Sequence, residues 1–217
     1  MLTVHHLQTS QSERIVWLCE ELGIAYQLKR YLRDPVTRLA PSRIKALHPM
    51  GIAPVITDGS LVLGESAAIA DYLIHRYGDG RLSVRPVDAG YADYLYWFHF
   101  ANGTLQPTLG RLLGLRRLNL PDDHPVIAPS RTRLAAALHM LEARLAVQPW
   151  LAGAQFTAAE VMSGFSLTTM RMFEPVDLTP YPHILGWLGR IGERPAYRRA
   201  LERAEPGMVP ALGAVAR

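Results

Sequence analysis

The sequence changes character near residue 79, and this change limits the folds that the chain can adopt. Up to about residue 78, short apolar runs typical of strands alternate with segments of helical periodicity. Beyond residue 88 the apolar residues keep a helical period and no strand alternation persists. We therefore expect an α/β domain over residues 1–78, a linker with turn-forming residues over 79–87, and an all-helical domain over 88–217.

The first part predicts the element order β-α-β-α-β-β-α. Its first strand, helix and second strand would form a βαβ unit with parallel strands, and a hairpin would add antiparallel ones. The expected strands cover 2–6, 25–31, 54–58 and 61–63, and the expected helices cover 12–22, 41–47 and 65–77. In the second part we expect helices over 91–118 with a bend near 103–107, then over 130–147, 157–173, 183–192 and 195–205.

The charge pattern argues against a nucleic-acid partner. The net charge is only +4 and the basic residues are spread along the chain. The cluster Arg194, Arg198, Arg199 and Arg203 is interspersed with glutamates, which favours a solvated helix face over a phosphate-binding surface. With 49% hydrophobic and 19% charged residues, the chain is also too apolar for a disordered protein.

A single cysteine, Cys19, excludes an intrachain disulfide, a Cys-x-x-Cys redox pair and a cysteine-based zinc site, and we expect no metal. It lies on the apolar stripe of the first expected helix, which indicates a core residue. The sequence has neither a long apolar run nor the features of a signal peptide at its start. We expect a cytoplasmic protein with no membrane partner.

Three segments of the first domain carry candidate site residues. Thr9, Ser10 and Ser12 lie between the first strand and the first helix. Ser10 and Glu13 have the spacing of a capping box, and Ser12 is an alternative N-cap. A hydroxyl here also stands at the positive end of a helix dipole, where an anion such as a thiolate is stabilised.

The second segment is the apolar turn that ends at Pro54, where a strand begins. The Ala53–Pro54 bond is a candidate cis peptide, which would turn the NH and C=O groups of Ala53 outward to pair with a peptide-like ligand. An ordinary trans proline opening an edge strand is the alternative.

The third segment is Glu65–Ser66, at the start of an expected helix. Hydroxyl and amide groups there can bind a carboxylate while Glu65 binds an ammonium group, so the pair could hold the head group of an amino acid. Capping by Ser66 beside an acidic residue that suits the dipole is the alternative. Taken together, the three segments would suit a γ-glutamyl tripeptide thiol.

These motifs resemble a known family. The segments Gly51-Ile-Ala-Pro54 and Leu63-Gly-Glu-Ser-Ala-Ala-Ile69 look like the thioredoxin-like domain of a cytosolic glutathione S-transferase. Residues 88–205 look like the helical domain of that family, and Phe156-Thr-Ala-Ala-Glu160 matches its N-capping box, with Glu in the place usually held by Asp. The resemblance implies glutathione as co-substrate, a small apolar electrophile as second substrate, and a homodimer.

The resemblance also implies roles for individual residues. Ala53 and Pro54 resemble the residues that pair with the cysteinyl backbone of glutathione, and Glu65 and Ser66 resemble the pair that holds its γ-glutamyl group. Ile52 departs from the family pattern, because a Lys or Gln usually stands there and helps to bind the glycyl carboxylate. Arg38 and Lys45 are candidate substitutes, suggested by their closeness in sequence.

The catalytic group is expected to be a hydroxyl, since no tyrosine lies near the loop and Cys19 is expected in the core. Ser10 is the first candidate, because it aligns with the serine of serine-type members when Arg14 matches their helix arginine; Thr9 and Ser12 follow. The electrophile pocket is expected in the helical domain at Tyr96, His99 and Phe100, an aromatic run that could equally belong to the core or a subunit interface.

Three function classes stay open at this point. The first is a glutathione transferase, in which the hydroxyl donates a hydrogen bond to the thiolate. The second is a non-catalytic glutathione-binding module on the same fold. The third is a glutathione-dependent peroxidase or thiol-exchange enzyme, which hydroperoxides and mixed disulfides would separate from the first.

Overall fold

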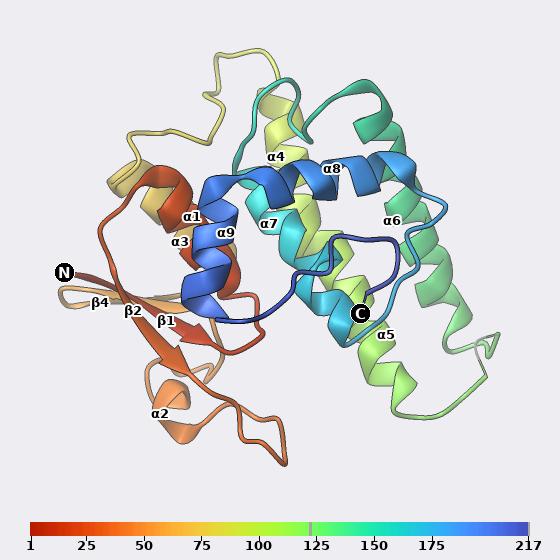
Figure 1. The fold of residues 1–217 in the computed structure, drawn as a ribbon, viewed down its shortest axis with the longest axis horizontal. Coiled ribbons are helices and arrows are strands. Elements are labelled where there is room, and N and C mark those ends of the chain that lie inside the picture. Colours follow the sequence, from red (N-terminus) through yellow and green to blue (C-terminus); the bar gives the residue numbers. More distant parts are fainter. Residues whose placement is uncertain (122, 217) are drawn as a thin grey trace. The chain divides into compact units, whose positions relative to one another are not determined.

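The computed structural model describes residues 1–121 and 123–216 (Figure 1). They form two compact units. Unit 1 comprises Met1–Ser83 with Glu193–Val209, and unit 2 comprises Val84–Gly192 with the residues from Pro210 onward. Among the described residues, no helix combines the length and the apolar character needed to cross a membrane.

Unit 1 contains a four-stranded mixed sheet in the order β2-β1-β3-β4. Strand β1 (Leu2–Leu7) runs parallel to β2 (Gln27–Tyr31) and antiparallel to β3 (Val55–Asp58), which pairs with β4 (Leu61–Gly64) in a hairpin. The helices are α1 (Glu13–Leu22), α2 (Ser42–Lys45), α3 (Ser66–Arg76) and α9 (Pro195–Ala204). This arrangement confirms the expected thioredoxin-like fold.

The side chains of β1 alternate between the two faces of the sheet, as successive residues of a strand do. On one face, Leu7 packs with Tyr31 of β2 and Ile44 of α2 in a small buried cluster. Helices α1 and α3 cover the other face (Figure 1), which receives His6. A histidine is therefore buried among the apolar residues of the sheet, where its ring nitrogens need partners.

Helix α9 packs against α1 through charged and aromatic contacts. Arg194 donates two hydrogen bonds to Glu21, at 2.6 and 2.7 Å. Arg199 and Arg203 each donate to one carboxylate oxygen of Glu20. The basic cluster is solvent-exposed at Arg198, Arg199 and Arg203, as expected, and carboxylates of α1 pair with Arg194, Arg199 and Arg203.

Unit 2 is helical, as expected from the sequence. The long stretch that begins at Tyr91 consists of α4 (Tyr91–Phe100), a π-helical segment (Ala101–Leu105) and α5 (Gln106–Arg116), so the expected bend is a change of helix type. The other helices are α6 (Ala128–Val147), α7 (Ala158–Leu167), a 3₁₀ turn (Thr169–Met172) and α8 (Pro182–Glu193). All ten residues of α7 are buried, which makes it the central helix of the unit.

Two polar side chains organise the interior of unit 2. Thr157 and Glu160 form the capping box expected from the sequence at the start of α7. Arg171 is fully buried after α7, and every hydrogen bond of its guanidinium within the described residues goes to a backbone carbonyl. The acceptors belong to Leu167 and Val176 and to the C-terminal segment at Ala211, Gly213 and Ala214.

Candidate active site

The loop between β1 and α1 gathers three hydroxyl side chains whose surroundings differ. Ser10 Oγ and Ser12 Oγ are 2.6 Å apart and hydrogen-bonded. Ser12 is completely buried, whereas Ser10 is 7% exposed. Thr9 has a φ of 46°, in the left-handed region that residues with a Cβ rarely adopt, and its buried Oγ1 has no hydrogen-bond partner in the described part of the chain.

Side-chain capping of α1, one alternative considered for these hydroxyls, is wrong for Ser12 and is met in part by Ser10. Ser12 is the N-cap of α1, yet its side chain makes no capping bond to the helix. Ser10 Oγ accepts the amide of Ser12 at 3.2 Å, and the amide of Glu13 is bonded by the Ser10 carbonyl instead. The backbone satisfies the helix start, so the Ser12 side chain is available for other contacts.

Those other contacts are with two residues that the sequence reasoning missed. Ser12 Oγ lies 2.9 Å from Nδ1 of His6, and Nε2 of His6 lies 2.9 Å from a carboxylate oxygen of Glu205. The Thr9 amide donates to the same carboxylate oxygen. His6 is 0% and Glu205 5% exposed, so a polar chain runs from a buried carboxylate to the Ser10 hydroxyl.

A second network joins the hydroxyl loop to the other two candidate segments. Arg14, fully buried in α1, donates to Oε1 of Gln11 at 3.2 Å and to Oγ of Ser66 at 3.3 Å. Gln11 in turn donates to the carbonyl oxygen of Ala53 at 3.1 Å. Burial is the main cause that lowers the pKa of Arg14 to about 9, and the Glu13 carboxylate opposes it. The structure thus brings the three segments together in unit 1.

The Ala53–Pro54 peptide bond is cis, one of the two alternatives considered from the sequence. At the third segment, Glu65 is exposed and has a φ of 65°, an unfavourable conformation for a residue with a Cβ. The alternative that Ser66 caps α3 is wrong, because Glu65 holds the N-cap position and no side chain makes a capping bond there.

The surroundings of Ile52 separate the two basic substitutes named from the sequence. Ile52 itself is exposed and offers no hydrogen-bond donor. Arg38 lies in the loop after β2, where its carbonyl accepts from Arg33. The side-chain stem of Lys45 packs beside Gly51, whose φ of 63° forms the turn next to Ile52. Of these two substitutes, Lys45 is therefore the one with a described contact to this turn.

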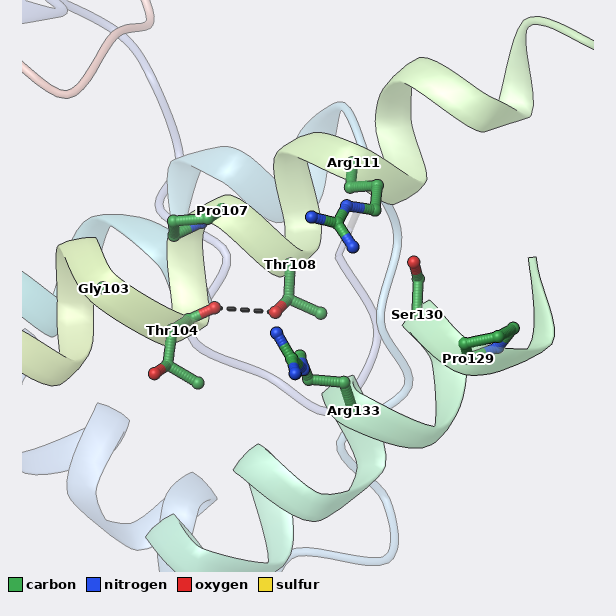
Figure 2. A pocket seen from close by; sticks show the side chains of 8 residues that line it. All are labelled: Gly103, Thr104, Pro107, Thr108, Arg111, Pro129, Ser130 and Arg133. Carbon is green, nitrogen blue, oxygen red and sulfur yellow. Dashed lines mark hydrogen bonds between the residues drawn. The ribbon is translucent and has the colours of Figure 1, made fainter. Parts of the chain in front are cut away.

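In unit 2, the expected electrophile-pocket residues have unequal exposure. Phe100 is buried and stacks with Tyr96 at a ring distance of 5.8 Å. Tyr96 and His99 are exposed. A cavity of about 230 Å³ elsewhere in this unit lies between α5 and α6 and includes none of the three. Figure 2 shows Arg111 of α5 and Arg133 of α6 extending their guanidinium groups into it.

Cys19 is fully buried in α1, as the sequence predicts. Burial is the main cause that raises the pKa of its thiol, and the neighbouring Glu20 carboxylate adds to the effect. A neutral, inaccessible thiol is a poor nucleophile. The polar groups available for chemistry at this end of the sheet are therefore hydroxyls and not a cysteine.

Both parts of the chain match families of known proteins. Residues 10–76 match the family described as "Glutathione S-transferase, N-terminal domain". Residues 115–195 match the family described as "Glutathione S-transferase, C-terminal domain". The two matches follow each other in the order expected from the sequence.

Individual relatives agree over nearly the full chain. Glutathione S-transferase 3 of Schizosaccharomyces pombe is 30% identical over 94% of this chain and 88% of its own length. A glutathione S-transferase structure from Actinobacillus pleuropneumoniae superposes with a TM-score of 0.84 at 33% identity, covering 94% of this chain and 93% of that one. A theta class glutathione S-transferase from Xanthomonas axonopodis pv. citri, solved with glutathione bound, has a TM-score of 0.70 at 30% identity, covering 92% and 96%.

Proposed function

The chain belongs to the glutathione S-transferase family, and on this basis we propose that it uses the Ser10 hydroxyl to stabilise the thiolate of glutathione and conjugates that thiolate to an apolar electrophile. The observation that carries this proposal is the order of the hydroxyls in the β1–α1 loop. Ser12 is buried behind Ser10, and the Thr9 hydroxyl oxygen is covered. Ser10 is the outermost member of the hydrogen-bonded pair.

The energies are adequate for this role. A free thiol with a pKa of about 8.5 is mostly protonated at neutral pH. A hydrogen bond to a charged acceptor contributes about 1.5–3 kcal/mol, which lowers a thiol pKa by roughly 1–2 units. The start of α1 adds about 0.3–1 kcal/mol through its dipole. Together these contributions make the thiolate a major species at neutral pH without a general base in contact with sulfur.

The remaining contacts follow from the network around Arg14. We propose that Glu65 and Ser66 hold the γ-glutamyl group and that Ala53 pairs with the cysteinyl backbone. Arg14 positions Ser66 for this task, and the unfavourable backbone of Glu65 is typical of a residue kept for a ligand. Lys45, beside the Gly51 turn, is the stronger candidate for the glycyl carboxylate, ahead of Arg38.

We also propose a cytoplasmic homodimer that acts in detoxification, with residues 1–78 binding glutathione and residues 88–217 supplying the electrophile pocket. Tyr96 and His99 support this division, because their exposed rings offer apolar surface to a second substrate. Sedimentation of the purified chain tests the dimer.

Ser10→Ala is expected to lower kcat/KM toward an aromatic halide about 10- to 100-fold, because the variant loses a hydrogen bond to the thiolate. Thr9→Ala is expected to stay near the wild type, and Ser12→Ala is measured beside them. Ser130→Ala removes a buried hydroxyl in unit 2 and is the matched control. Full activity in all three loop variants would exclude the hydroxyl mechanism.

The same assay separates the alternatives. Binding of glutathione by calorimetry without turnover of any halide or hydroperoxide would indicate a binding module. Turnover of hydroperoxides without halides would indicate a peroxidase.

A further inference from the structure

The Ser10 hydroxyl is one end of a continuous polar chain whose other end is a buried carboxylate. The successive separations are 2.6 Å from Ser10 to Ser12, 2.9 Å from Ser12 to His6 and 2.9 Å from His6 to Glu205. Exposure falls from 7% at Ser10 to 0% at Ser12 and His6. All four residues belong to unit 1, although Glu205 follows them by almost the full length of the chain.

The donors in this chain can be assigned by counting protons. The Glu205 carboxylate only accepts, so His6 donates from Nε2, and a neutral His6 then accepts at Nδ1. Ser12 donates its one hydroxyl proton to that nitrogen, which is closer than its other acceptor, the Leu7 carbonyl at 3.4 Å. Ser12 Oγ already accepts the Leu7 amide at 3.0 Å, so its second lone pair accepts the Ser10 hydroxyl proton.

The Ser10 proton has a different direction in the two protonation states of the chain. While His6 is neutral, the Ser10 proton points inward, and the outward side of Ser10 is a lone pair. A lone pair can accept the proton of a thiol but cannot donate to a thiolate. The Ser10 hydroxyl can then donate to a thiolate in two ways: it rotates its proton away from Ser12 and loses that hydrogen bond, or it exchanges its proton along the chain and keeps every hydrogen bond of the chain.

We propose that His6, held by Glu205, takes up the thiol proton of glutathione through Ser12 and Ser10. The proton leaves sulfur for Ser10 Oγ, the former Ser10 proton moves to Ser12 Oγ, and the former Ser12 proton moves to Nδ1 of His6. Sulfur keeps its electron pair, and one proton in total is transferred. Ser10 now points its new proton at the thiolate, so deprotonation and stabilisation are one event. This inference rests on the proposed function.

The surroundings of His6 and Glu205 suit the uptake of a proton. Glu205 accepts both the His6 ring and the Thr9 amide, so its charge is balanced within the chain when His6 becomes an imidazolium. Arg33 is the charged side chain with a described electrostatic interaction with Glu205. Ser12, the hydroxyl in contact with His6, is completely buried and cannot reach a substrate as a nucleophile. His6 and Glu205 are therefore positioning residues that act through Ser10.

The test counts the protons released when reduced glutathione binds. Thiolate formation is followed by its ultraviolet absorbance, and proton release by calorimetry in buffers of different ionisation enthalpy. A relay to His6 predicts release of close to zero protons per thiolate formed in the wild type, whereas ionisation without an internal acceptor predicts about one. Thiolate formation with release of about one proton would overturn the relay and leave the proposed function standing. Absence of any bound thiolate would overturn both.

Two variants interrupt the chain at different points. Glu205→Gln removes the charge that stabilises a protonated His6, and Ser12→Ala removes the bridge between His6 and Ser10. Each is expected to raise the pKa of the bound thiol, lower kcat about tenfold and restore release of about one proton, with little change in KM for glutathione. Ser12→Ala keeps the His6–Glu205 pair intact and serves where Glu205→Gln fails to fold.

Glu160→Gln is the matched control, because it neutralises another buried carboxylate, in unit 2. It is expected to change stability but neither the pKa of the bound thiol nor the proton count. A folded Glu205→Gln protein with the proton count and thiol pKa of the wild type would contradict the relay.

Discussion

Replacing Arg171 by methionine is expected to lower the free energy of unfolding by about 3–5 kcal/mol, because several buried carbonyls lose their donor at a cost of about 1–3 kcal/mol each. The guanidinium donates to carbonyls on both sides of it in the chain, including Leu167 at 3.4 Å and Gly213 at 3.0 Å. Methionine fills similar space but donates nothing, so these buried carbonyls would lose their partners.

The measurement is urea unfolding together with limited proteolysis. Because Arg171 fixes Ala211, Gly213 and Ala214, the segment from residue 210 is expected to become sensitive to protease before the rest of unit 2 unfolds. Arg85→Met is the matched control; Arg85 is exposed and pairs with the solvent-accessible carboxylate of Asp88 at 2.8 Å, so a much smaller loss is expected. Equal losses in the two variants would contradict the role given to Arg171.

Glu160 is expected to make the protein more stable as the pH falls from about 7 toward 5. Burial is the main cause that raises its pKa from 4.5 to about 7, against the hydrogen bonds from Thr157 and Leu151 that lower it. Between these two values the folded protein holds a proton that the unfolded chain has released. Stability is therefore gained as the pH falls through the folded pKa, by up to about 3 kcal/mol for a shift of this size.

Comparison of the wild type with Glu160→Gln isolates this contribution. Other carboxylates, including those of Glu20 and Asp58, have lowered pKa values and act in the opposite sense at lower pH, but they are common to both proteins. The difference in unfolding free energy between wild type and variant is expected to be larger at about pH 5 than at about pH 7.5. A difference that does not change with pH would show that Glu160 titrates normally.

Patterns local in the sequence predicted most of the fold. The periodicity of the first 78 residues gave the element order, and the Thr157–Glu160 spacing gave the capping box of α7. The element ends differ by one or two residues in most cases, because helix and strand ends depend on local hydrogen bonds. The expected helix over 157–173 was too long, since α7 ends at Leu167 and a 3₁₀ turn follows.

The contacts of the candidate site were harder to foresee. The sequence suggested capping of α1 by Ser10 or Ser12. The Ser12 hydroxyl instead contacts the buried ring of His6, which needs a polar partner. That contact depends on a strand residue facing α1, and on Glu205 at the far end of the sequence. One signal was available, namely a histidine at the position of β1 that alternates with Val4 and Leu2 on the buried face.

The grouping of α9 with unit 1 also depends on contacts between residues that are far apart in the sequence. Its arginines form a charge run in the sequence, and such runs usually face solvent. Here Glu20 and Glu21, about 175 residues earlier, give Arg194, Arg199 and Arg203 their partners. Pairing of this kind is a property of the folded chain and leaves no local pattern.

The burial of Cys19 affects how well the protein resists inactivation by alkylation. A catalyst that delivers electrophiles to sulfur is itself at risk of alkylation wherever it exposes a thiolate of its own. This chain has one sulfhydryl, closed inside α1 and held in its protonated form by burial. Under the proposed function, the reactive sulfur arrives with glutathione and leaves with the product, so the electrophile meets no accessible thiol of the protein itself.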